Sequence, residues 1–352
     1  MKDMTIQRKI ALIALLIVTL SLSHASARAA QQGRWVSGSV NNSSSARGYK
    51  LWVPAGYGGK FPVPLLLMLH GCTQTPDDFA AGTRMNEIAD ANRFLVAYPE
   101  QPSEANAYKC WNWFLPEHQS RGAGEPALLA AVVEQVRASY RVDAQRVYVA
   151  GVSAGAAMAV ICGATYPDIF AAIGVHSGLQ YKGATNLAEA LAAQTKGAGP
   201  DPNRQGLLAY QTINGVKSGA RKAGIPVIVF HGSLDAAVNP ANAEQVVKQW
   251  AQTDDYLDDD GDNNTVDDRA DATTNGTVAG GYTYTKQIYN DAEGKPLIEK
   301  WIVQGMKHAW SGGSAAGSYT DAKGPDASAE MWRFFRSYKL ASPRIKRKGA
   351  KP

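Results

Sequence analysis

The sequence has few cysteines, little net charge and no apolar run long enough to span a membrane comfortably. Its three cysteines, Cys72, Cys110 and Cys162, stand far apart without any CxxC pair, which argues against a cysteine-rich metal site. The formal net charge of +5 gives no support for nucleic-acid binding. The most apolar stretch, residues 10–22, falls short of the roughly 18 residues that a spanning helix needs. We therefore expect no nucleic-acid partner, no metal, no cofactor and no stable membrane span.

The start of the chain has the order of an export signal. Basic residues within 1–9 precede the apolar run, and small residues around Ala27 to Ala30 offer cleavage sites. We predict that residues 1–30 are a signal peptide and that the mature protein is secreted, to the periplasm or out of the cell; an uncleaved anchor is the alternative. Export would place the cysteines in an oxidising compartment, where an odd number allows at most one pair and a spare thiol.

Composition and hydrophobic pattern predict the fold class. Hydrophobic residues make up 45% and charged residues 19% of the chain, the balance of a globular protein with a sizeable core. Residues 64–69 read PLLLML, which is typical of a strand covered on both faces. Further strands are predicted at 49–53, 94–98, 147–150, 170–176, 227–230, 282–289 and 297–303, and helices at 77–92, 125–140, 154–166, 241–250 and 327–338. This alternation predicts an α/β fold whose mostly parallel central sheet has helices on both faces.

No internal repeat and no long linker divides the chain, so we predict one domain over residues 31–340. An acidic insertion of about residues 254–278 begins DDYLDDDGDNNTVDD and is interpreted as a solvated loop. It resembles a calcium loop only loosely, because Asn263 stands where such a loop has glycine and Arg269 where it has glutamate. The basic segment 341–352 predicts a disordered tail.

A serine between two glycines is the first chemical motif. Residues 151–155 read GVSAG and fit G-x-S-x-G, which on its own is a weak signal. An alternating apolar strand precedes it and small residues follow, the setting of a strained strand-to-helix turn that presents a hydroxyl at the sheet edge. Ordinary packing of glycines at a turn is the alternative. The context predicts Ser153 as a nucleophile, which then needs a base.

His308 is the histidine best placed to be that base, because it lies in a glycine-bounded loop after the last predicted strand. His70 and His231 each follow an apolar strand in an HG pair and are interpreted as buried corner residues. Asp235 also follows a buried strand and is predicted to orient the base, with a helix-cap or turn role as the alternative. The chain order Ser153, Asp235, His308 matches the layout of α/β-hydrolases.

Acyl chemistry also needs hydrogen-bond donors for the oxyanion. The backbone N–H of Ala154, directly after the serine, is the first predicted donor. The second is the N–H of Cys72, in the loop that follows strand 64–69, where Gly71 lets the backbone turn.

Five motifs in order, HGCTQ, KCWNWF, GVSAGAAM, HGSLDAAVNP and GMKHAWSGG, resemble the secreted esterases of the polyhydroxybutyrate depolymerase family. That family is related to feruloyl and acetylxylan esterases, and the similarity extends over about residues 48–338. It implies an α/β-hydrolase fold and a serine carboxylic-ester hydrolase with Ser153 as nucleophile, Asp235 as orienting acid and His308 as base.

The resemblance further implies oxyanion donors at Cys72 and Ala154. It also implies a disulfide between Cys72 and Cys110, which would leave Cys162 as the spare thiol. Finally, it implies an active site lined by aromatic residues, namely Trp111, Trp113 and Trp310.

The substrate stays open at this point. Family members that attack solid polyester carry an added surface-binding domain, whereas here only a basic tail follows the last predicted helix. Hydroxyalkanoate oligomers, short acyl esters, and feruloyl- or acetyl-sugar esters all fit the motifs. Acyl transfer to an alcohol and a non-catalytic envelope-binding protein on the same scaffold are the further alternatives, and the oligomeric state is not determined.

Overall fold

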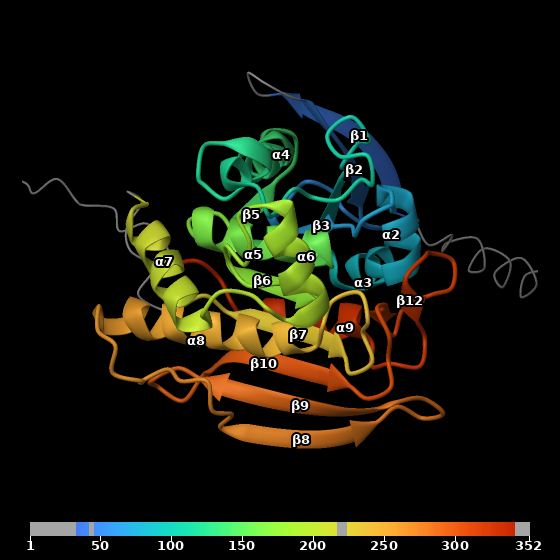
Figure 1. The fold of residues 1–352 in the computed structure, drawn as a ribbon. Helices are drawn as coiled ribbons and strands as arrows, with labels where there is room; N and C mark the ends of the chain where they lie inside the picture. The colour runs from blue at the N-terminus through green and yellow to red at the C-terminus, as the bar shows by residue number, and fades with distance from the viewer. Residues whose placement is uncertain (1–32, 42–45, 217–223, 342–352) are drawn as a thin grey trace, which may run out of the picture.

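A ten-stranded sheet runs through the part of the chain that the computed structural model describes, residues 33–41, 46–216 and 224–341 (Figure 1). The predicted signal peptide and nearly all of the predicted tail lie outside these residues. The strand order is β1-β2-β4-β3-β5-β6-β7-β10-β9-β8. The strands are β1 Arg34–Asn41, β2 Ala46–Val53, β3 Val63–Leu69, β4 Leu95–Pro99, β5 Val142–Val152, β6 Ala172–His176, β7 Val227–Gly232, β8 Ala272–Thr277, β9 Thr283–Asn290 and β10 Pro296–Val303.

The centre of the sheet is parallel and both of its edges are antiparallel. Strands β4, β3, β5, β6, β7 and β10 pair in parallel, whereas β1 and β2 at one edge and β9 and β8 at the other pair antiparallel. Figure 1 shows β8 and β9 as the outer edge beyond β10. This arrangement confirms the predicted mostly parallel α/β sheet and the antiparallel pairing of the last two predicted strands.

Helices cover both faces of the sheet. The helices are α2 Pro76–Thr83, α3 Met85–Asn92, α4 Gly124–Ser139, α5 Ala154–Thr165, α6 Leu187–Lys196, α7 Pro202–Asn214, α8 Ala241–Asp259 and α9 Ala327–Phe335, with a short 3-10 turn, η1, at Pro116–His118. Helices α4 to α8 pack into one hydrophobic core and α2, α3 and α9 into the other. Along β3, Leu65 and Leu67 belong to the first core and Leu66 and Met68 to the second, which confirms that this run is covered on both faces.

The helix predicted over residues 77–92 is two helices. Arg84 separates α2 from α3 because its backbone adopts the left-handed region, with φ 54°. Its N–H donates to the carbonyl of Ala80 and so ends α2. The left-handed residue therefore interrupts what would otherwise be one continuous helix.

The acidic insertion is less loop-like than predicted. Helix α8 continues to Asp259, and residues 272–277 form the edge strand β8, so the prediction of a loop over about 254–278 is wrong at both ends. The reason is that its carboxylates are used internally. Buried Asp255 accepts hydrogen bonds from the N–H groups of Asn263, Asn264 and Val266, which folds the remaining loop onto the end of α8.

No helix in the described residues is both long and apolar enough to cross a bilayer. In the same part of the chain, no group of three or more histidine, cysteine or acidic side chains is arranged to hold a metal ion.

Candidate active site

Ser153 occupies the turn between β5 and α5. Its backbone has φ 57° and ψ −123°, a conformation that a non-glycine residue adopts only at a cost of about 1–3 kcal/mol. The N–H of Ser153 donates to the carbonyl of His176 on the neighbouring strand β6, at 2.9 Å. The sharp turn brings the serine to the carboxyl edge of the sheet, where it lines a pocket of about 160 Å³.

The two glycines that flank this serine are required by close backbone approach. A Cβ on Gly151 would lie 2.5 Å from the backbone of Gly155. A Cβ on Gly155 would overlap the carbonyl oxygen of Leu69 and lie 2.5 Å from that of His70. The start of α5 therefore rests directly on the end of β3, which no larger residue would permit.

Asp235 and His308 form a hydrogen-bonded pair beside this turn. The buried Asp235 follows β7, and its Oδ2 accepts a hydrogen bond from Nδ1 of His308 at 2.7 Å. Its Oδ1 accepts the N–H groups of Ala237 and Val238 at 3.0 and 2.8 Å. Burial raises the pKa of Asp235, but hydrogen bonds from His231 and His308 outweigh it and hold the pKa below its usual range. The carboxylate is therefore anionic next to the imidazole.

His308 and Ser153 line the same pocket, together with Cys72, Gln194 and Tyr319. Because a carboxylate only accepts hydrogen bonds, the proton on the imidazole must sit on Nδ1, which leaves Nε2 as an acceptor. No aspartate, glutamate, lysine or arginine is among the described residues that line the pocket. The pocket thus places the hydroxyl of Ser153 and the imidazole of His308 among side chains that carry no formal charge.

The loop after β3 also lines this pocket, through Gly71, Cys72 and Gln74. A Cβ on Gly71 would lie 3.5 Å from the Cβ of Ser153, so this loop passes directly against the serine. Gln74 anchors it, because its Oε1 accepts the N–H of Gly71 at 2.9 Å. Within the described ranges, the N–H groups of Cys72 and Ala154 have no hydrogen-bond partner, so both are free to bind an anionic oxygen.

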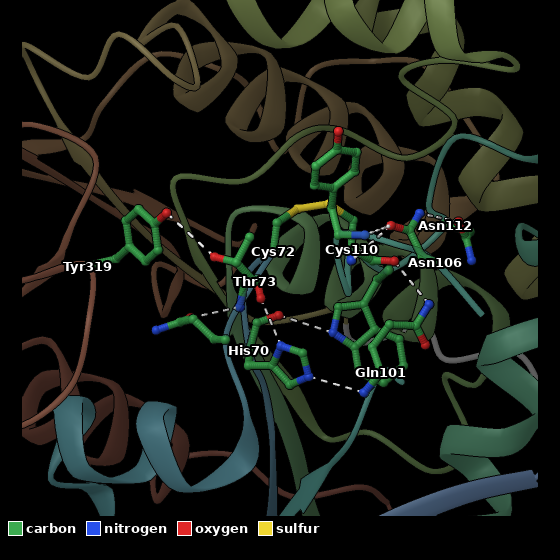
Figure 2. Close-up of a disulfide and its surroundings, with 12 residues drawn as sticks. His70, Cys72, Thr73, Gln101, Asn106, Cys110, Asn112 and Tyr319 are labelled. Atoms are coloured by element: carbon green, nitrogen blue, oxygen red, sulfur yellow. Dashed lines mark hydrogen bonds between the residues drawn. A yellow bond between two sulfur atoms is a disulfide. The ribbon is translucent and has the colours of Figure 1, made fainter. Parts of the chain in front are cut away.

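A disulfide joins Cys72 to Cys110, as the family resemblance implied (Figure 2). The N–H of Thr73 also donates to the carbonyl of Tyr108 at 2.6 Å, so two adjacent links tie the loop to the segment around Cys110. The third cysteine, Cys162, is free and buried in α5.

The three tryptophans predicted to line the site are buried, and none of them is among the described residues that line the pocket. The indole of Trp111 donates to the carbonyl of His70 at 3.0 Å, beneath the loop, and that of Trp310 donates to Ser328. Trp113 is 4% exposed. Buried tryptophans need a partner for their N–H, and here the fold itself supplies it for two of the three.

Tyr319 is the aromatic side chain that does line the pocket. It lies between two short paired strands, β11 Trp310–Ser311 and β12 Thr320–Asp321, is 50% exposed, and has its hydroxyl 3.5 Å from that of Thr73 (Figure 2). Neither Tyr319 nor Gln194 of α6 was expected from the sequence. Both lie in segments without a predicted element, and no motif marks them.

Three other histidines near the sheet edge are buried, which agrees with the interpretation of two of them as corner residues. The rings of His70 and His176 each accept a backbone N–H, from Gln101 and Ser311 respectively. Burial lowers the pKa of His70 to about 4 and that of His176 to about 3, so both are neutral. His231 is also fully buried and contacts Asp235 rather than the pocket.

Comparison with known proteins identifies the family. The family profile described as esterase PHB depolymerase matches residues 47–274, well over half of the chain. The chain belongs to this family. The esterase PHB depolymerase family is a hydrolase family.

Its relatives include several esterases. It is 35% identical over 248 residues to poly(3-hydroxyalkanoate) depolymerase C of Paucimonas lemoignei, covering 70% of this chain and 54% of that protein. It is 33% identical over 193 residues to feruloyl esterase B of Neurospora crassa, covering 53% and 64% respectively. The chain thus spans between half and two thirds of the length of these relatives. The acetyl xylan esterase from Aspergillus awamori has the same fold, with a TM-score of 0.63 at 22% identity over 78% of this chain and 94% of that one.

Proposed function

We propose that this esterase-family protein is an exported serine carboxylic-ester hydrolase that cleaves esters of short acyl groups, hydroxyalkanoate oligomers foremost. The observation that carries the proposal is the convergence of three side chains. Ser153 stands on a strained turn in the same pocket as His308, whose other ring nitrogen is bonded to the buried carboxylate of Asp235. Both the family and its depolymerase relative agree with this activity.

The proposed reaction follows from these groups. The hydroxyl of Ser153 attacks the ester carbonyl carbon while Nε2 of His308 takes its proton, and Asp235 stabilises the resulting imidazolium. The N–H groups of Cys72 and Ala154 donate to the oxyanion of the tetrahedral intermediate. His308 then protonates the leaving alkoxide, which leaves an acyl group on Ser153. Water attacks this acyl-enzyme by the same proton transfers and releases the acid.

Pocket size and charge support a small, neutral acyl group. The pocket volume of about 160 Å³ is well below the roughly 300–1,000 Å³ of pockets that enclose drug-sized ligands. A short aliphatic acyl group fits this space better than a hydroxycinnamoyl group does. The described lining contains no aspartate, glutamate, lysine or arginine, which favours an uncharged ester.

A panel of esters tests the function. Wild type, Ser153→Ala and the control Ser139→Ala, an exposed position at the end of α4, are assayed on hydroxybutyrate trimer, acetylated xylo-oligosaccharide, a feruloyl sugar and short nitrophenyl esters. We expect the trimer to give the highest kcat/KM, Ser139→Ala to match wild type and Ser153→Ala to lose at least 10³-fold in kcat. Activity retained by Ser153→Ala would contradict the mechanism.

A carbohydrate esterase is the second candidate, because Tyr319 at the pocket mouth offers an aromatic face to a sugar. A tenfold preference for the acetylated or feruloyl sugar over the trimer would favour it. Adding glycerol to the same assays distinguishes acyl transfer, which yields a glycerol ester, from hydrolysis, which yields free acid.

A further inference from the structure

We propose that the face of the protein opposite the active site docks on an anionic phospholipid membrane. Its centre is a groove of about 550 Å³ that is lined by three arginines, Arg34, Arg137 and Arg141, and no acidic side chain is among its described lining residues. Guanidinium groups bind phosphate oxygens through paired hydrogen bonds, which suits them to lipid headgroups. The inference goes beyond the proposed ester hydrolysis and does not depend on it, because docking involves no ester cleavage.

Three separate segments supply the arginines. Arg34 is the first residue of β1, Arg137 lies in the last turn of α4, and Arg141 directly precedes β5. Figure 1 shows α4 beside β1 and β2. The helix end explains Arg137, which lies near the negative end of the α4 dipole and pairs with Glu134 at 2.6 Å, but it explains neither of the others. Within the described ranges no carboxylate pairs with Arg34 or Arg141, so both can bind a phosphate.

An exposed aromatic side chain stands beside the groove. The loop after β2 carries Tyr57, which lines the groove, and then Lys60 and Phe61, whose ring is 77% exposed, more than any other large apolar side chain that the structure describes. The loop is tied down, because the N–H of Arg141 donates to the hydroxyl of Tyr57 at 2.8 Å and its guanidinium donates to the carbonyl of Lys60 at 3.0 Å. One exposed phenylalanine is common on protein surfaces. Cations next to a fixed, exposed aromatic ring are typical of surfaces that lie on a membrane.

The groove lies at the amino ends of strands whose carboxyl ends carry the active site. The N–H of Val63, the first residue of β3, donates to the carbonyl of Arg141 at 2.9 Å, whereas the other end of β3 leads to Gly71 and Cys72 in the pocket. In the same way, β5 leads from Arg141 to Ser153. Strand β3 alone spans about 20 Å. A protein docked by the groove would therefore present its active-site pocket to the solution and not to the lipid.

The end of the chain adds positive charge on the same side. The N–H of Leu340 donates to the carbonyl of Gln145 near the start of β5 at 2.9 Å, and the side-chain amide of Gln145 donates to the carbonyl of Leu340 at 3.0 Å. The residues after Ala341 lie outside the described part of the chain, and their sequence, SPRIKRKGAKP, contains five lysines and arginines and no acidic residue. Each cation held close to an anionic membrane adds attraction, which salt weakens.

Sedimentation with lipid vesicles tests the docking. The exported protein is mixed with phosphatidylcholine vesicles that contain phosphatidylglycerol, and with vesicles of phosphatidylcholine alone. We expect binding to the anionic vesicles only, and weaker binding as salt is added. Arg34→Gln/Arg137→Gln/Arg141→Gln should bind at least tenfold more weakly than wild type. A control that removes the same charge at exposed cations outside the groove should stay within about threefold of wild type. It combines Lys196→Gln, Arg204→Gln and Lys323→Gln.

Phe61 is tested separately from charge. Phe61→Ser should weaken binding to the anionic vesicles about three- to tenfold, because the apolar contact with the lipid is lost. Phe61→Trp should bind at least as tightly as wild type, since tryptophan favours the membrane interface. Leu191→Ser, at an exposed apolar position on α6, is the matched control and should bind like wild type. Thermal unfolding of each variant verifies that it is folded.

Four results would overturn the proposal. The first is equal binding of wild type and the triple arginine variant, and the second is binding to phosphatidylcholine alone that is as tight as binding to the anionic vesicles. The third is a complete loss of binding when the chain is ended at Ala341, with no loss in the triple arginine variant, because the tail alone would then hold the membrane. The fourth is tighter binding to dextran sulfate than to vesicles, with both unchanged in Phe61→Ser, because the groove would then take a soluble polyanion.

Discussion

Both carboxylate oxygens of Asp235 accept hydrogen bonds. Two backbone N–H groups fix one oxygen and His308 binds the other, so the imidazole is oriented by a carboxylate that cannot rotate. In Asp235→Asn, an amide N–H would face Nδ1–H of His308, and the ring would adopt the wrong tautomer. We predict a fall in kcat of about 10³–10⁴ with little change in KM, measured on a nitrophenyl ester. A loss below tenfold would show that Asp235 only caps its turn.

The lowered pKa of Asp235 predicts a loss of stability in acid. An unfolded aspartate has a pKa of about 3.9, and the folded value lies below it. The contribution of ionised Asp235 to the free energy of unfolding is therefore complete above the unfolded pKa, and it is lost as the pH falls through the folded pKa. Urea unfolding of wild type and Asp235→Asn should show the wild-type advantage at pH 7 and a smaller one below about pH 4. An advantage that grows in acid would contradict the assigned anionic state.

Gly155 should tolerate no side chain. In Gly155→Ala, the added Cβ meets backbone atoms of Leu69 and His70, which cannot move without separating α5 from β3. We predict a loss of about 3 kcal/mol or more in the free energy of unfolding. Gly58→Ala is the matched control, because a Cβ there meets nothing within 4 Å and its φ is not positive. Equal urea midpoints for the two variants would show that α5 has room to shift.

At the scale of elements, sequence patterns predict the strands and helices whose two faces are buried, and they miss the strands at the edges of the sheet. The run in β3 and the small residues of α5 predict central elements because burial forces their composition. Edge strands β1 and β8 carry mostly exposed side chains, so no apolar alternation marks them. The end of α8 was missed for the opposite reason. Acidic residues indicated solvent, but Asp254 and Asp255 are buried and accept backbone N–H groups.

The disulfide joins two loop segments, the loop after β3 and the segment around Cys110. It closes a separation of 38 residues, for which chain entropy gives a stabilisation of up to about 4 kcal/mol. We predict that Cys72→Ala/Cys110→Ala lowers the free energy of unfolding by 2–4 kcal/mol, since variants commonly lose less than the entropic limit. Cys162→Ala serves as the cysteine control for reductant sensitivity. Adding reductant should lower the free energy of unfolding of wild type by the same 2–4 kcal/mol. No change on adding reductant would contradict a stabilising disulfide.

For the whole molecule, the sequence predicts the three reactive side chains of the candidate site better than it predicts the residues that line the pocket around them. Ser153, Asp235 and His308 each follow a strand, and the carboxyl ends of parallel strands meet at one edge, so chain order alone brings them together. The walls come from tertiary packing. Tyr319 reaches the pocket through a loop whose path depends on distant contacts, such as that between Ser318 and Gln74. Local patterns carry no record of such contacts.

The disulfide and the N-terminal segment lead to one prediction about the whole protein. A disulfide that joins the loop after β3 to the segment around Cys110 forms and persists only where thiols are oxidised, and the first thirty residues have the order of a signal peptide. Expressed from Met1 in a bacterial host, the protein should be recovered outside the cytoplasm with a mass lacking about 27–30 residues. It should carry one disulfide and one thiol that reacts only after unfolding, because burial raises the pKa of Cys162. Protein made in a reducing cytoplasm should contain three thiols and unfold at lower denaturant until it is oxidised. The prediction of export would be contradicted if the protein kept its first thirty residues, contained three reduced thiols and was still active.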